Sequence, residues 1–263
     1  MRLALAEVKP QPRKVAENLR ALDEAMSQVP SADLVAFPEL FLTGYALGDA
    51  FHRLALRKDS KELSTLAEIA QRQGKWIVTG APVESPTRRG EVWNAAVVVG
   101  PQGEMQVNGK RYLPNFGPFE EGLQFTPADA ALVVETPFGR IGTLICYEVF
   151  FPEVARKLAL QGADLLLAIS ASPVTSRTLF AKLIPARAIE NATGFGYVNR
   201  VGVEDSMVFD GGSQFCDPKG EVLEPEVHPL PDGQRILEYD VPLEEYSRYR
   251  PSRPVLRDIR LLA

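Results

Sequence analysis

The sequence predicts an α/β fold in which helices pack outside one mixed β-sheet or a pair of sheets. Apolar side chains dominate the short segments 33–40 and 163–170, as expected of strands that are buried on both faces. Amphipathic segments with helical spacing separate several of the predicted strands. Turn signals join other strands as hairpins. This mixture of crossovers and hairpins favours a mixed sheet or two sheets.

The first third of the chain predicts two strands and two helices. The opening segment RLALAEV, residues 2–8, is predicted as a strand, and the apolar run at 33–40 as a second. Apolar residues recur at helical spacing in 11–29 and again in 60–73, and Ser60 is suited to cap the second helix. Each strand is therefore followed by a helix that could cover it.

Hairpins dominate the middle of the chain. Residues 76–83 are predicted as a strand. Residues 92–99 and 105–110 form a hairpin around a Pro-Gln-Gly turn, and residues 131–135 and 140–146 form another around Thr-Pro-Phe-Gly.

Strands and helices alternate again in the last part. A helix is predicted from Pro152 to about residue 161, a buried strand at 163–170, a helix at 177–191 and a strand at 196–203. The tail from Tyr246 is rich in arginine and proline and is predicted to lie outside the core. The remaining predictions are a hairpin at 212–223 and a strand at 236–241.

Composition excludes several classes of protein. The 263 residues carry a net charge of −5, which argues against a nucleic-acid binder. No apolar run reaches the roughly 18 residues of a membrane helix, and the N-terminal apolar stretch is shorter than a signal peptide requires. Two cysteines and two histidines predict neither a disulfide scaffold nor a histidine-rich metal site. We therefore expect one cytoplasmic domain over residues 1–263, without metal or cofactor.

Three reactive side chains follow predicted strands. Cys146 ends an apolar strand and precedes a helix, at the edge where α/β active sites form. Glu39 comes directly after a strand and a proline, and a partly buried carboxylate there could act as a general base. Lys110 ends a hairpin strand, and its ammonium could lower a thiol pKa or hold an oxyanion. Taken singly, each could be an ordinary structural or surface residue, as Cys216 is predicted to be.

Together these residues resemble the nitrilase superfamily of carbon–nitrogen hydrolases. The segments FPEL, GKRYLP and ICYEVFFPE are similar to the three motifs that carry its Glu-Lys-Cys triad, in the same order. The resemblance spans essentially the whole chain. It implies a four-layer α-β-β-α sandwich, a triad of Glu39, Lys110 and Cys146, a thioester intermediate, and pairing into a homodimer or larger oligomer in which the tail arginines could take part.

A narrower resemblance links the chain to the glutaminase domain of glutamine-dependent NAD synthetase. The segments KRYLPNFGPFEEGLQF and YVNRVGVEDSMVFDGGSQFCDPKG carry it. It implies that Glu121 is a fourth catalytic residue, with Glu120 as its rival. It also implies glutamine as substrate and a separate NAD synthetase that uses the ammonia. The residues expected to contact substrate are Phe116, Phe119, Tyr147, Ser172 and Arg177.

Two other functions remain open at this point. Tyr147 stands where NAD synthetases carry an acid, and Val203 replaces a glycine of their VGG run. These departures also fit a free-standing ω-amidase or an N-carbamoyl amide hydrolase. A catalytically inactive binding module is the alternative of another class, although the intact Glu39, Lys110 and Cys146 argue against it.

Overall fold

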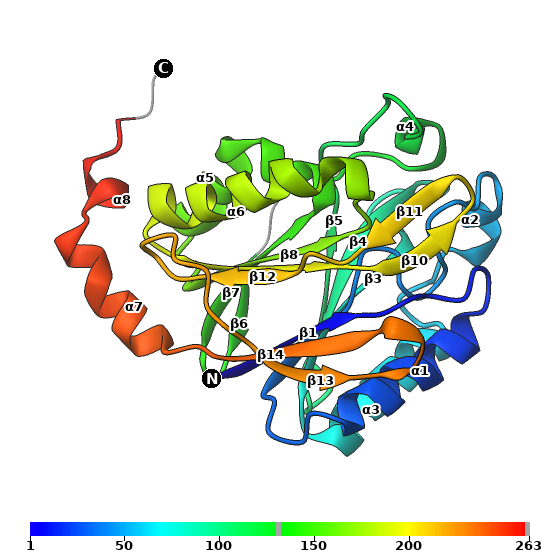
Figure 1. Ribbon diagram of the computed structural model, residues 1–263. Coiled ribbons are helices and arrows are strands. Elements are labelled where there is room, and N and C mark those ends of the chain that lie inside the picture. The colour runs from blue at the N-terminus through cyan, green and yellow to red at the C-terminus, as the bar shows by residue number, and fades with distance from the viewer. Residues whose placement is uncertain (130–132, 261–263) are drawn as a thin grey trace.

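Two β-sheets lie at the centre of the structure, a computed structural model that describes residues 1–129 and 133–260 (Figure 1). Within this part of the chain the larger sheet has seven strands, in the order β13 (Glu226–Pro229), β14 (Arg235–Asp240), β1 (Arg2–Glu7), β2 (Leu34–Ala36), β3 (Trp76–Glu84), β4 (Val92–Val99) and β5 (Met105–Gly109). The smaller has five, in the order β12 (Gln214–Cys216), β9 (Gly194–Asn199), β8 (Leu165–Ser170), β7 (Gly139–Ile145) and β6 (Val133–Thr136).

Helices cover the outer face of each sheet. The apolar faces of α1 (Val15–Ser27) and α3 (Lys61–Gln73) share a buried cluster with the larger sheet. Helices α5 (Pro152–Leu160) and α6 (Arg177–Asn191) pack on the smaller sheet (Figure 1). The layers therefore run helix, sheet, sheet, helix, which confirms the predicted four-layer sandwich.

Alternation along β1 shows how one strand serves two layers. Leu3 and Leu5 face the smaller sheet, whereas Ala4 and Ala6 face the helices, and all four are fully buried. The sheets approach closely, because a Cβ placed on Gly196 of β9 would lie 3.3 Å from Leu3 Cδ2. This two-sided burial explains the apolar character of the strands.

Both sheets end in loops that carry the polar side chains. Strands β1 to β3 are parallel in the larger sheet, and β7 to β9 are parallel in the smaller, so each sheet gathers carboxyl ends of strands at one edge. The elements outside the layers are α2 (Ala50–Leu54), α4 (Glu121–Gln124), a 3₁₀ helix η1 (Cys146–Phe150), the hairpin β10 (Val201–Glu204) and β11 (Met207–Asp210), α7 (Leu243–Tyr249) and α8 (Val255–Asp258).

Two predictions about the C-terminal half were wrong. The strand predicted at 196–203 is two strands, because the chain leaves the smaller sheet at Arg200 and β10 then pairs only with β11. Tyr246 was expected outside the core, yet it is buried and its ring lies parallel to that of Phe215. The tail is also anchored, because the Arg250 guanidinium donates to the Ala163 carbonyl oxygen of the same chain.

The remaining predicted elements differ from those in the structure mainly in their length. The hairpin predicted at 212–223 holds only β12 and a single bridge between Cys216 and Val222. Of the strand predicted at 131–135, residues 131 and 132 lie outside the described residues. Strands β11 and β13 and helices α2 and α4 were not predicted. No described helix is long and apolar enough to span a membrane.

Candidate active site

The backbone of β3 fixes the position of Glu39. Gly80 of β3 donates to the Pro38 carbonyl at 3.1 Å and accepts from the Leu42 N–H at 3.1 Å. A Cβ on Gly80 would lie only 2.1 Å from the nitrogen of Leu40, so only glycine leaves room for this crossing. The segment after β2 is thereby pressed against β3, and the side chain of Glu39 is fully buried.

Lys110 joins two carboxylates. It directly follows β5, and its Nζ donates to Glu39 Oε1 and to Glu121 Oε1, both at 2.7 Å. Lys110 is fully buried, and Glu121 is 4% exposed. Glu39 is 71 positions from Lys110 in sequence and Glu121 is 11, and both carboxylates meet at one ammonium group. The geometry selects Glu121 over the exposed Glu120 as the partner of Lys110.

Further donors hold the two carboxylates. Asn94 Nδ2 donates to Glu39 Oε1 at 2.7 Å and to Glu121 Oε2 at 3.3 Å. The backbone N–H of Ala171, just after β8, donates to Glu39 Oε2 at 2.9 Å. Both oxygens of Glu39 are therefore bonded, and its orientation is fixed by groups from both sheets.

Cys146 stands at a sharp turn beside this cluster. It follows β7 and begins η1, and its φ of +45° lies in the left-handed region that residues other than glycine rarely adopt. Such strain persists only where the surrounding structure determines it, and it is concentrated at active sites. Cys146 is 8% exposed.

The charges around the thiol oppose its ionisation. Burial raises the pKa of Cys146 well above its ordinary value, and the Glu39 charge acts in the same direction, while Lys110 opposes them. Burial would lower the pKa of Lys110, but Glu121 and Glu39 outweigh it, so its pKa is raised and it stays protonated. The resting site therefore holds a neutral thiol beside a permanent cation.

Glu121 and Tyr45 form a hydrogen-bonded pair of titratable groups beside Lys110. Burial raises the pKa of Glu121, although Lys110 lowers it in part. The Tyr45 hydroxyl donates to Glu121 Oε1 at 2.5 Å. Burial also raises the pKa of Tyr45 well above its ordinary value, and the charge of Glu121 adds to this, so Tyr45 remains a donor.

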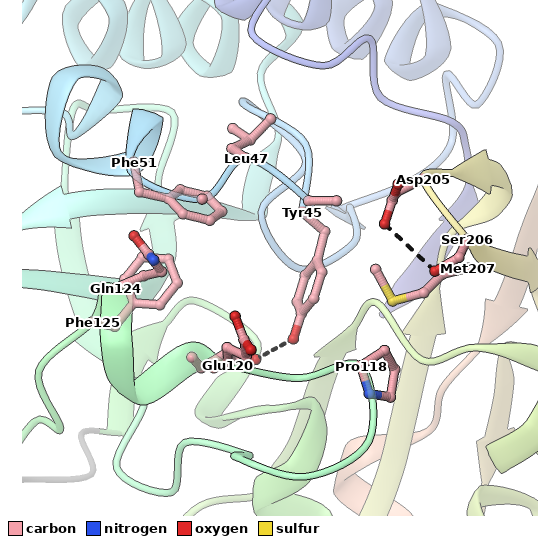
Figure 2. A pocket seen from close by; sticks show the side chains of 13 residues that line it. Tyr45, Leu47, Phe51, Pro118, Glu120, Gln124, Phe125, Asp205, Ser206 and Met207 are labelled. Carbon is pink, nitrogen blue, oxygen red and sulfur yellow. Dashed lines mark hydrogen bonds between the residues drawn. The ribbon is translucent and has the colours of Figure 1, made fainter.

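A cavity of about 400 Å³ borders this cluster, because Tyr45 and Glu121 are among the residues that line it. Figure 2 shows the Tyr45 ring between Phe51 on one side and Met207 on the other. Carboxylates of Glu120 and Glu121 and of Asp205 line the cavity. Among the described lining residues, none is lysine, arginine or histidine. The full lining is Tyr45, Ala46, Leu47, Gly48, Phe51, Pro118, Glu120, Glu121, Gln124, Phe125, Asp205, Ser206 and Met207.

The predicted aromatic contacts lie in one row beside the site. Phe119 packs edge-on against Tyr45 with ring centroids 6.2 Å apart, and Phe116 lies 5.5 Å from Phe119 and 5.2 Å from Tyr147. The row links the cavity wall to the residue after Cys146. Phe116 is half exposed, so this row borders solvent.

Ser172 and Arg177 lie apart from the cavity. Ser172 is buried, and its backbone N–H donates to Asn199 Oδ1 at 2.9 Å. The guanidinium of Arg177 is mostly exposed and donates to Asp210 Oδ2 at 2.6 Å. Neither residue lines the cavity.

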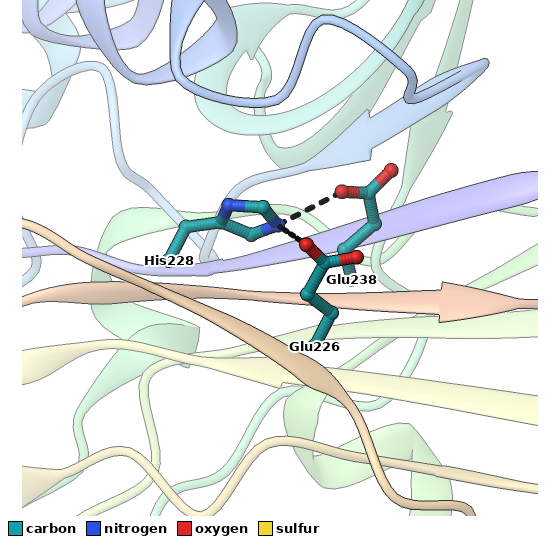
Figure 3. A group of neighbouring side chains, drawn as sticks. All are labelled: Glu226, His228 and Glu238. Carbon is teal, nitrogen blue, oxygen red and sulfur yellow. Dashed lines mark hydrogen bonds and ion pairs between the residues drawn. The ribbon is translucent and has the colours of Figure 1, made fainter.

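One group of side chains has the composition of a metal site. Ligand atoms of Glu226, His228 and Glu238 lie within 4.8 Å of one another, and Figure 3 shows the His228 ring directed at both carboxylates. Arg2 already pairs with Glu238 at 3.1 Å and with Glu226 at 3.0 Å. Since the Arg2 guanidinium already binds both carboxylates, the arrangement fits an ion-pair network better than a cation site.

Sequence reasoning missed Tyr45 and Asn94. Asn94 is a polar residue inside the otherwise apolar strand β4, and it is fully buried. A buried amide in such a strand requires a hydrogen-bonding partner, which is a signal that could have marked it. Tyr45 follows Glu39 by six residues in FLTGY and offered no comparable signal.

Comparison with known proteins identifies the family. The model of the carbon–nitrogen hydrolase family matches residues 2–251. The chain belongs to the carbon–nitrogen hydrolases. The predicted resemblance is thus confirmed, and the chain is an amide-hydrolysing enzyme.

The relatives and solved structures similar to this chain carry different names. A protein of Pseudomonas protegens named hydrolase in pqqF 5′region is 36% identical, over 84% of this chain and 76% of its own length. The glutamine-dependent NAD(+) synthetase of Thermotoga maritima is 34% identical over 85% of this chain, which spans only 39% of that protein. A variant of the amidase from Nesterenkonia sp. AN1 superposes with a TM-score of 0.79 and 29% identity, covering 98% of this chain and 97% of that one. It carries the acetamide moiety of fluoroacetamide on its active-site cysteine.

Proposed function

We propose that this carbon–nitrogen hydrolase cleaves a linear amide through a thioester on Cys146, and that glutamine is its substrate. The contact of Lys110 with both Glu39 and Glu121, beside the strained Cys146, carries the proposal. A separate ammonia-dependent NAD synthetase would then use the ammonia.

Acylation begins with the neutral thiol. Glu39 takes the proton from Cys146 Sγ as the sulfur attacks the amide carbon, and the C–S bond forms while the carbonyl oxygen gains negative charge. Lys110 and the backbone N–H of Tyr147 stabilise that oxyanion. Glu39 then gives its proton to the amide nitrogen, the C–N bond breaks and ammonia leaves.

Deacylation reverses these roles with water. Glu39 removes a proton from water, whose oxygen attacks the thioester carbon to form a second oxyanion at Lys110. The C–S bond breaks, the carboxylic acid is released, and the proton held by Glu39 returns to the sulfur of Cys146. Glu121 keeps Lys110 directed at the oxyanion throughout, since it binds the same ammonium at 2.7 Å.

Two observations support glutamine. Glutamine-dependent NAD synthetases are among the relatives, and the segment from Lys110 to Phe125 resembles their glutaminase domain. In this proposal Ser172 and Arg177 bind the amino-acid end, and Arg177 must exchange its bond to Asp210 for the substrate carboxylate.

A free-standing amidase is the second candidate, and the cavity favours it. Its carboxylates, Glu120 and Asp205 among them, would repel the carboxylate of an amino-acid amide, and Arg177 is paired elsewhere. A neutral aliphatic amide meets no such penalty.

An amide panel tests both candidates. Ammonia release is measured with glutamine, 2-oxoglutaramate, N-carbamoyl-β-alanine and butanamide, and mass spectrometry follows the acyl adduct. We expect turnover of glutamine and an adduct on Cys146, which Cys146→Ala abolishes and Cys216→Ser preserves. Preference for butanamide would favour the second candidate. Failure of all four amides to react, without any adduct, would support an inactive binding module.

A further inference from the structure

We propose that Glu148 is a positioning residue that holds Lys110 and Cys146 in fixed register. Its carboxylate binds residues of both chain segments that carry these groups. The inference rests on the proposed function, because it assigns those two residues to the reaction. It concerns a side chain that contacts neither the cavity nor the reacting atoms.

Each oxygen of Glu148 holds a different segment. Oε1 accepts from the backbone N–H of Arg111 at 3.0 Å and from Arg111 Nε at 2.8 Å. Oε2 accepts from the backbone N–H of Ile145 at 2.9 Å. Arg111 directly follows Lys110, and Ile145 directly precedes Cys146. One carboxylate therefore bridges the residue after the cation and the residue before the nucleophile.

The bridge that Glu148 forms between Arg111 and Ile145 is shielded from solvent and has little freedom to move. Glu148 is 1% exposed, and the side chain of Arg111 is 12% exposed. Charge-assisted bonds in such surroundings are stronger than neutral ones, and a buried carboxylate with several partners has little freedom to move. The bond to Ile145 also helps to hold the left-handed φ of Cys146, which would otherwise relax.

A chemical argument makes the link specific to a carboxylate. An ionised carboxylate accepts at both oxygens, whereas an amide of the same shape has one acceptor and one donor. In Glu148→Gln, the amide NH₂ must face an N–H of either Arg111 or Ile145, so one segment is released. Misplacement of a reacting group by about 1 Å can cost about 10²-fold in rate.

The reactivity of the Cys146 thiol depends on the position of Lys110 and can therefore be measured to detect a shift of Lys110. Lys110 lowers the pKa of Cys146, so a Lys110 that moves away leaves the thiol less reactive. The titratable groups that face Cys146 from the packed elements are Glu39, Tyr45, Lys110, Glu121 and Tyr197. Of these five groups, only Lys110 adjoins a residue that Glu148 binds.

The experiment compares Glu148→Gln with Glu153→Gln, which makes the same chemical change on an exposed residue five positions later. We measure kcat and KM for the best amide and the pH profile of Cys146 alkylation by iodoacetamide, followed on the Cys146 peptide by mass spectrometry. We expect Glu148→Gln to lower kcat about 10²-fold, to leave KM within threefold, and to slow alkylation with a profile displaced to higher pH. Glu153→Gln should match the parent.

Two further variants separate the outcomes. Arg111→Lys keeps the backbone N–H and should lose less activity than Glu148→Gln. If Glu148→Gln does not fold, Glu148→Asp decides, since the shorter carboxylate cannot span both segments and should slow alkylation likewise. An alkylation profile identical to the parent in a folded Glu148 variant overturns the inference. Alkylation needs no natural substrate, so it still tests Glu148 if no amide is hydrolysed and the proposed function fails.

Discussion

Replacing Gly80 by alanine should disable the enzyme without touching a charged group. The added Cβ would lie 2.1 Å from the Leu40 nitrogen and 2.6 Å from the Glu39 Cα. Non-bonded atoms of this kind need about 3.5 Å. The Glu39 backbone must therefore retreat from β3 by about 1 Å or more, because the obstacle is backbone and cannot rotate away.

This shift of the backbone would displace Glu39, the proposed general base. Glu39 is held by bonds of 2.7 Å from Lys110, 2.7 Å from Asn94 and 2.9 Å from the Ala171 N–H, so a shift of that size breaks their geometry. A 1 Å misplacement costs about 10²-fold in rate, and overpacking costs roughly 1–3 kcal/mol of stability. We expect kcat to fall at least about 10²-fold while the protein still folds.

The assay is kcat for the preferred amide, with thermal unfolding measured in parallel. Gly196→Ala is the control, because its Cβ would meet only side-chain ends, Leu167 Cδ1 at 3.0 Å and Leu3 Cδ2 at 3.3 Å. It should lower stability but keep kcat near that of the parent. A Gly80→Ala enzyme with kcat within threefold of the parent would refute the assignment of Glu39 as a base positioned by β3.

Three other substitutions give distinct signatures. Lys110→Gln should lower kcat about 10²- to 10³-fold, as removal of an oxyanion donor does, and a parent-like kcat would exclude that role. In Tyr45→Phe, loss of a hydrogen bond that lowers the pKa of Glu121 should move the acid limb of the kcat profile to higher pH, and an unmoved limb would contradict this. For Glu238, burial acts to raise the pKa, yet hydrogen bonds, Arg2 among the donors, hold it below the ordinary value. Its stabilising effect is therefore present above about pH 4 and lost as pH falls through the folded-state pKa. The free energy of unfolding of Glu238→Gln, measured in urea, should be lower than that of the parent at pH 7. The two values should converge in acid, and a difference that stays constant with pH would count against this linkage.

Local pattern was sufficient for most of the strands and for the positions of the three reactive residues. The structure places Lys110 and Cys146 directly after β5 and β7, and Glu39 in the loop that follows β2. The four layers were expected from the family resemblance, since periodicity could not distinguish one mixed sheet from two. The end of β9 at Asn199 was missed because valines, which favour strands, lie on both sides of Asn199 and Arg200.

Partners that are distant in sequence could not be predicted. Asn94 meets Glu39 across 55 positions, and Glu148 meets Arg111 across 37. Nothing in the local sequence of either member indicates the other. The tail was misjudged for a similar reason, because composition averages over Tyr246 and its polar neighbours, while burial is decided by one ring packing against Phe215.

The charge balance of the cluster explains how a carboxylate can replace an imidazole. Burial raises the pKa of Cys146, and the neighbouring Glu39 and Glu121 act in the same direction against Lys110, which is why the resting thiol stays protonated. Proton transfer from Cys146 to Glu39 removes one negative charge as it creates another, so the total is unchanged. As the thiol attacks, that charge passes to the carbonyl oxygen within reach of Lys110. In the proposed mechanism the site therefore stabilises negative charge on the substrate more than on the free sulfur, which is the difference that accelerates a reaction.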